Sequence, residues 1–246
     1  MKEMSFVEHL EDLRKAAIRI LIIICVSFFV AYAQGDVISD FLLAPLRGAL
    51  ENSSGKIVQL GILDKVLAQF QVAFWSSLLL SSPLWFRELW IFIKPGLYAE
   101  EVKVIRPFIF LGFVFFALGV GFGYYLVFPA TFETFLNFGV QDVEQMMGIK
   151  EYLVLACKVL LFLGIIFQLP NAMLILGYMG LATKQSLRGW RRYIFVGFAI
   201  LSAALTPPDI VTMLGLWVPL VVLYEIGIIG VALFCSSFLR KASYLE

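Results

Sequence analysis

Charge is the scarcest property of this 246-residue chain. Only 15% of its residues are charged, against about a quarter in soluble domains. The 19 basic and 18 acidic residues leave a formal net charge of +1. Because a nucleic-acid-binding domain carries a strong basic excess, this balance argues against a nucleic-acid partner.

The groups that catalysis needs are equally sparse. The chain has a single histidine, His9, and contains no G-x-x-x-x-G-K-[ST], H-E-x-x-H or G-x-S-x-G motif. Its three cysteines, Cys25, Cys157 and Cys235, lack metal-ligand spacing, and we expect them to pack as small apolar side chains. We therefore predict a protein that binds or transports rather than an enzyme, with no metal ion or cofactor.

Apolar side chains are what the chain has in abundance. Hydrophobic residues make up 61% of the sequence, and the mean hydropathy is +0.91. A run of about 20 such residues crosses a bilayer as a helix, because a helix satisfies its own backbone hydrogen bonds in lipid. We therefore predict an all-α, polytopic membrane protein, with residues 1–246 forming one integral membrane domain of six spans. The predicted spans are residues 16–33, 66–86, 105–128, 152–180, 193–205 and 210–238.

Two of these runs allow more than one interpretation. Ala31-Tyr32-Ala33 resembles a signal-peptide cleavage site, but acidic residues such as Glu8 precede the run, so we favour a retained first span. The run 193–205 measures about 20 Å as a helix, against roughly 30 Å of hydrocarbon. Either it thins the bilayer or sits behind its neighbours, or Trp190 and the turn at 206–208 extend it within the interface.

Basic residues divide unevenly between the two ends of the spans. With the N-terminus inside, fourteen of the 19 basic residues flank the inner ends, and four flank the outer ends. By the positive-inside rule, both termini are predicted to face the cytoplasm. The four outer residues are Arg47, Lys56, Lys65 and Lys150.

Three polar side chains lie within the predicted spans, where an ionisable group by default marks a functional surface or a paired interior. Lys158 can extend its stem toward the interface, Gln168 can hydrogen-bond a neighbouring helix, and Glu225 needs a partner or a proton. An alternative function that would use all three is a proton- or ion-coupled small-solute transporter. Such transporters usually show inverted repeats, and this sequence has none.

Acidic residues cluster on the predicted cytoplasmic side, where the positive-inside rule does not require them. Glu8, Glu11 and Asp12 precede the first span, and Glu100 and Glu101 lie in the first inner loop. They either form local salt bridges or bind a cationic ligand, and paired carboxylates suit the two parallel hydrogen bonds of a guanidinium group. A purely structural scaffold would not explain the cluster.

Short motifs recur along nearly the whole chain, each weak alone but specific in this order. Together they resemble the TatC family, the multispanning receptor subunit of the twin-arginine protein translocase. The motifs are SFVEHLEDLR at 5–14, APL at 44–46, FIKPGLYAEE at 92–101, F-x-x-G-x-x-F-x-Y at 116–124 with FP at 128–129, GIIFQLP at 164–170, TPPD at 206–209 and YEIG at 224–227.

The resemblance implies a concave six-helix bundle that is the core receptor subunit of the twin-arginine translocation system. It implies that twin-arginine signal peptides of folded proteins bind at the cytoplasmic face. It further implies single-span TatA- and TatB-type partners, further copies of this chain, a lipid environment in a bacterial-type inner membrane, and export driven by the proton-motive force. The residues implied for signal-peptide binding are Asp12, Glu101, Glu11, Arg14 and Phe92; for helix docking in the membrane, Gln168, Tyr124, Thr206, Asp209, Thr212 and Glu225; and for structure, Pro45, Pro95, Gly119, Pro129 and Pro170.

The chain departs from the family pattern at two positions. Family members commonly carry a glutamate where this chain has Gln168, so the amide offers hydrogen bonds without charge. Met213 stands where the family often has glutamine, which reduces the polar cluster at that end to the neighbouring Thr and Asp residues. Asp12 replaces a glutamate, a milder change that shortens the reach by one methylene and keeps the charge.

Overall fold

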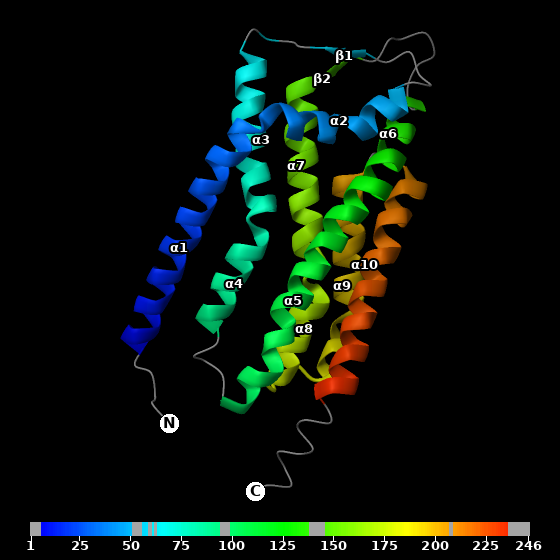
Figure 1. Ribbon diagram of the computed structural model, residues 1–246. Coiled ribbons are helices and arrows are strands. Elements are labelled where there is room, and N and C mark those ends of the chain that lie inside the picture. Colours follow the sequence, from blue (N-terminus) through cyan, green and yellow to red (C-terminus); the bar gives the residue numbers. More distant parts are fainter. Residues whose placement is uncertain are drawn as a thin grey trace, which may run out of the picture.

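The computed structural model describes residues 6–50, 56–58, 61, 63–93, 99–137, 146–206 and 209–235, and most of these are helical (Figure 1). The helices form six columns: α1; α3 with α4; α5 with η2 and α6; α7 with α8; α9; and α10 with η3. This arrangement confirms the predicted all-α membrane fold. The bounds are α1 Phe6–Ala33, α2 Gly35–Leu50, α3 Asp64–Leu80, α4 Ser82–Ile93, α5 Ala99–Phe122, η2 Gly123–Val127, α6 Phe128–Asn137, α7 Ile149–Ile166, α8 Leu169–Tyr178, α9 Lys184–Leu205, α10 Ile210–Gly230 and η3 Val231–Cys235.

Four stretches of the described chain are long and apolar enough to cross a membrane by themselves. The remaining two columns are less uniform, because α3–α4 is interrupted at Ser81 and α9 carries four basic residues in its first nine. The helix α9 is 22 residues long, so it extends well beyond its apolar part at 193–205 and includes Trp190. The four stretches are Leu10–Ala33, Pro107–Phe132, Ile149–Tyr178 and Ile210–Leu233.

The columns have two distinguishable ends (Figure 1). At one end, which we call the head end, α1 and α9 begin and η3 stops. At the opposite end, which we call the α2 end, the short helix α2 lies across the columns. There β1 (Lys56–Val58) also pairs in parallel with β2 (Met146–Gly148). Neither α2 nor the strand pair was expected from the sequence.

Two prolines lie where one helix of a column ends and the next helix begins. Pro83 and Pro170 each lie in the first turn of a helix, α4 and α8 respectively. A proline is tolerated there because the first backbone N–H groups of a helix have no partner within it. The second predicted span, residues 66–86, is thus divided between α3 and α4.

Pro129 directly follows the third predicted span, which ends at residue 128. The column continues past it through α6 to Asn137. Directly before Pro129, the segment η2 is a π-helix in which the Phe128 N–H bonds the Gly123 carbonyl. The wider π turn makes room for the proline ring inside a continuous helix. The helix that carries the third predicted span therefore continues for nine residues beyond residue 128.

The columns α5 and α7 approach each other through glycines. A Cβ atom added at Gly119 would lie 2.7 Å from the Leu163 carbonyl oxygen, and one at Gly164 would lie 2.7 Å from the Phe116 ring. Leu160 and Leu163 of α7 are almost fully buried near this contact. The absence of a side chain at Gly119, predicted to be structural, allows this close approach and places α7 at the centre of the core.

Candidate functional site

The head end of α1 carries three of the residues implied for signal-peptide binding. Glu11 pairs with Lys15 one turn further on, with Nζ and Oε1 3.0 Å apart and both side chains largely exposed. Arg14 is exposed, whereas Asp12 is half-buried. The local salt bridge that the sequence allowed thus exists for Glu11, and Asp12 lies on a different side of the helix.

The other implied acid lies on α5. Glu101 belongs to the first turn of that helix, but its side chain, like Pro95, lies outside the described residues. Phe92, in the last turn of α4, is half-buried. Phe92 also lines a groove, and the first residue of α1 that lines it is Leu13, which directly follows Asp12.

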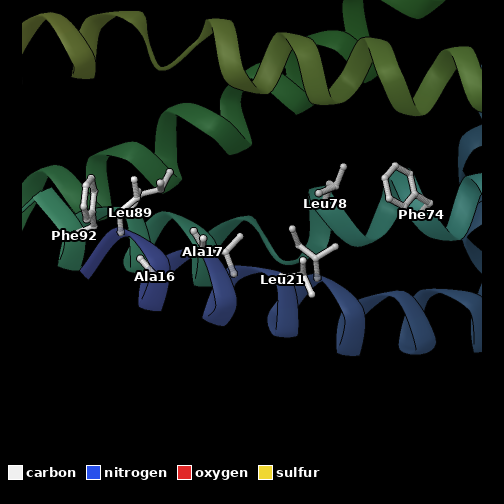
Figure 2. Close-up of a pocket in the computed structure, with 10 residues that line it drawn as sticks. Ala16, Ala17, Leu21, Phe74, Leu78, Leu89 and Phe92 are labelled. Carbon is white, nitrogen blue, oxygen red and sulfur yellow. The ribbon is translucent and has the colours of Figure 1, made fainter. Parts of the chain in front are cut away.

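This groove runs along α1 on the side that faces α3 and α4 (Figure 2). Its volume is about 580 Å³, and every lining residue is apolar. The two alanines of α1, Ala16 and Ala17, leave room that a larger side chain would fill. The lining residues are Leu13, Ala16, Ala17, Ile20, Leu21 and Ile24 of α1, Phe74 and Leu78 of α3, and Leu89 and Phe92 of α4.

A buried carboxylate lies on α4, where this helix contacts α1. Glu88 of α4 has a side chain only 6% exposed, and Arg19 of α1 and Arg87 both contact it. Glu88 is not among the site residues predicted from the sequence, because it lies two residues beyond the second predicted span, which ends at residue 86. An acid within one helical turn of a span's end is the signal that identifies such a group.

Gln168 connects α5 to the break between α7 and α8. Its Nε2 donates to the Gly112 carbonyl at 2.8 Å, and its Oε1 accepts from Asn171 Nδ2 at 3.4 Å. Asn171, which is 4% exposed, also donates to the Phe108 carbonyl at 3.3 Å. These contacts confirm the structural interpretation of Gln168 as an amide that hydrogen-bonds a neighbouring helix.

Three of the residues implied for helix docking gather at the α2 end. The Asp209 carboxylate caps α10 by accepting from the Thr212 backbone N–H at 3.0 Å. Thr206 donates to the Ser202 carbonyl at 2.8 Å. Thr206, Thr212 and Thr131 line a cavity of about 220 Å³ between η2–α6 and α10.

The remaining docking residues lie elsewhere. Glu225 forms an ion pair with Arg191 of α9 toward the head end, and Tyr124 of η2 holds α2. Lys158 lies over the Trp75 ring, with its Nζ 5.3 Å from the ring centroid, an arrangement that stabilises a cation. Within the part of the chain that the structure describes, Lys158, Gln168 and Glu225 therefore each contact a different partner.

Comparison with known proteins decides the family. The family described as Sec-independent protein translocase protein (TatC) matches residues 8–219 of this chain. The chain belongs to the TatC family. A TatC from Desulforapulum autotrophicum is 37% identical over 229 residues, covering 93% of this chain and 84% of that protein. A TatC from Helicobacter pylori is 33% identical over 221 residues, covering 90% and 85%.

The fold agrees with that of solved TatC structures. A crystal structure of a twin arginine translocase receptor, TatC, superposes with a TM-score of 0.80, covering 92% of this chain and 99% of that chain at 24% identity. The resemblance found in the sequence motifs is thereby confirmed. As a TatC family member, the chain is a membrane-embedded component of a Sec-independent protein translocase, and its role is in protein transport.

Proposed function

We propose that this protein is the translocase subunit that receives twin-arginine signal peptides of folded proteins at its head end. The observation that carries the proposal is the position of Asp12, a carboxylate that directly precedes Leu13, the first residue of α1 to line the apolar groove. A signal peptide has the complementary order, with basic residues followed by an apolar stretch of about 7–15 residues.

The chemistry of the ligand follows from the acidic groups. A carboxylate accepts two parallel hydrogen bonds from a guanidinium fork, whereas a lysine ammonium offers only a compact point charge. Asp12 is the main acid on α1 and Glu101 its counterpart on α5, while Glu11 and Arg14 flank Asp12 and set the local charge. Phe92 provides an apolar contact between the acidic head and the groove.

The other parts of the proposal concern assembly. Single-span subunits of the TatA and TatB type and further copies of this chain would pack on its lipid-facing helices in a bacterial-type inner membrane, and the proton-motive force would drive export. Support comes from the surface of α1, because only 11% of the residues in the most apolar 18-residue stretch of Leu10–Ala33 are buried within the chain. The cavity near Thr206 and Thr212 offers a second, more polar contact for a partner helix.

Site-specific photocrosslinking in native membranes tests the proposal. The probe is a signal peptide with a photoreactive residue beside its arginine pair, compared with a version carrying two lysines. We expect the arginine peptide to crosslink preferentially and Asp12→Asn or Glu101→Ala to reduce its crosslinking about tenfold, because each removes a charge-assisted hydrogen bond.

The matched control is Asp40→Asn, which neutralises an exposed aspartate at the α2 end. That variant is expected to crosslink like the wild type. Equal crosslinking of the two peptides, or an unchanged signal in Asp12→Asn, would contradict the proposal.

A further inference from the structure

Glu88 is a buried carboxylate held by two arginines. Its side chain is 6% exposed, whereas those of Arg19 and Arg87 are 49% and 65% exposed. Arg19 Nε lies 3.0 Å from Glu88 Oε2, and Arg87 Nη1 lies 3.1 Å from Oε1. Each carboxylate oxygen therefore faces a different guanidinium group, and both arginine side chains are more exposed than that of Glu88.

Arg19 occupies this carboxylate incompletely. The contact joins Arg19 Nε to Glu88 Oε2. Although it lies at ion-pair distance from Arg19, Glu88 Oε2 accepts no hydrogen bond of acceptable geometry from the described residues. A buried carboxylate with a free acceptor position has hydrogen-bonding capacity for a better-placed donor.

Arg19 also places Glu88 near the proposed signal-peptide site. It follows Asp12 by seven residues, which is two helical turns or about 10 Å, so the two residues share one side of α1. The carboxylate of Glu88 thus meets the same side of α1 as Asp12, two turns deeper in the membrane. Phe92 lies one turn after Glu88 on α4, between this position and the head end.

We propose that Glu88 is a second arginine-reading carboxylate of the signal-peptide site, and that Arg19 is an internal stand-in displaced by the peptide. Neighbouring side chains of an extended peptide point in opposite directions. One arginine of the pair then bonds the acids at the head end, Asp12 and Glu101, while the other reaches inward to Glu88. This inference rests on the proposed function and adds a specificity-determining residue to it.

The test measures peptide affinity for the full-length protein in lipid nanodiscs, using a fluorescent signal peptide with either two arginines or two lysines. Glu88→Gln is expected to weaken binding of the arginine peptide about tenfold and leave the lysine peptide nearly unchanged. Arg19→Gln is expected to tighten binding of the arginine peptide several-fold, because the internal competitor is gone. The matched control Arg47→Gln, at the α2 end, is expected to change neither affinity.

A purely structural pair gives the opposite results. If Arg19 and Glu88 only clamp α1 to α4, Arg19→Gln weakens binding and the exchanged variant Arg19→Glu/Glu88→Arg restores it. Either result overturns the inference. The proposal expects the exchanged variant to stay defective while its melting temperature remains close to that of the wild type, since the ion pair is kept but the carboxylate has moved to α1.

The outcome separates this inference from the proposed function. Suppose that the wild type prefers the arginine peptide, that this preference depends on Asp12, and that Arg19→Gln does not tighten binding. This result refutes only the role of Glu88 and leaves the proposed function standing. Equal affinity of the wild type for both peptides refutes the proposed function itself.

Discussion

Individual residues explain how a proline is tolerated inside α2. The N–H of residue 45 would normally bond the Phe41 carbonyl one turn earlier, but Pro45 has no N–H to donate. The Tyr124 hydroxyl donates to that carbonyl instead, at 2.7 Å, and its ring stacks on the Phe41 ring with centroids 4.3 Å apart. Pro45 and Tyr124, assigned separately to structure and to docking, are thus parts of one contact between α2 and η2.

This contact predicts an energetic coupling between the two residues. Tyr124→Phe removes the hydroxyl that donates to the Phe41 carbonyl, and it is expected to lower the free energy of unfolding by about 1 kcal/mol. In a Pro45→Ala background the new backbone N–H can bond the Phe41 carbonyl, so the same change is expected to cost less. Denaturant titration in mixed micelles gives the four values of this double-mutant cycle.

Tyr125→Phe is the control, since Tyr125 is 71% exposed. We expect it to be neutral. Equal costs of Tyr124→Phe in both backgrounds would show that the hydroxyl does not replace the missing N–H.

The residues implied by the motifs illustrate what a sequence reveals at this scale. Asp12 stands out because an acid among basic residues is unusual at a cytoplasmic end. Glu88 does not stand out, because its burial depends on the approach of Arg19 from α1, which no local pattern records. The same holds for the Glu225–Arg191 pair, whose members are 34 residues apart.

At the scale of elements, the contact between α5 and α7 depends on glycine. Gly119→Ala is expected to destabilise the protein by about 1–3 kcal/mol, because the new methyl group meets the Leu163 carbonyl, a backbone atom that cannot turn away. The measurement is the thermal unfolding midpoint of the purified protein in detergent.

Gly121→Ala is the matched control on the same helix. A Cβ atom at Gly121 has nothing within 4 Å, so this change is expected to be neutral or slightly stabilising through the better helix propensity of alanine. Equal midpoints for the two variants would mean that α5 and α7 can separate without cost.

Most of the helical elements could be predicted, and the exceptions have physical reasons. Apolar runs reveal spans because lipid leaves the backbone no alternative to a helix. The helix α2 was missed because it is a short helix, not a span, and Pro45 lies inside it. The helix of the third predicted span continues past Pro129 because a π turn before this proline removes the clash by which proline normally ends a helix.

For the whole molecule, the distribution of basic residues predicts the orientation in the membrane. In a variant without its native cysteines, Asp40→Cys at the α2 end is expected to react with a membrane-impermeant maleimide added outside. Lys184→Cys at the start of α9 is expected to react only after the membrane is opened. Both positions are exposed in the structure, so the reverse pattern would overturn the predicted orientation.

The strand pair at the α2 end has a consequence for the order of biosynthesis. β1 and β2 are separated in the chain by α3–α4 and by α5–η2–α6, so the pair can form only after both columns have crossed the membrane. The ion pair between Asp64 and Lys150, 3.5 Å apart, joins the same two regions. In a nascent chain that has emerged only as far as β1, this strand therefore has no β2 to pair with. The pair can form once the ribosome has synthesised β2 and the beginning of α7.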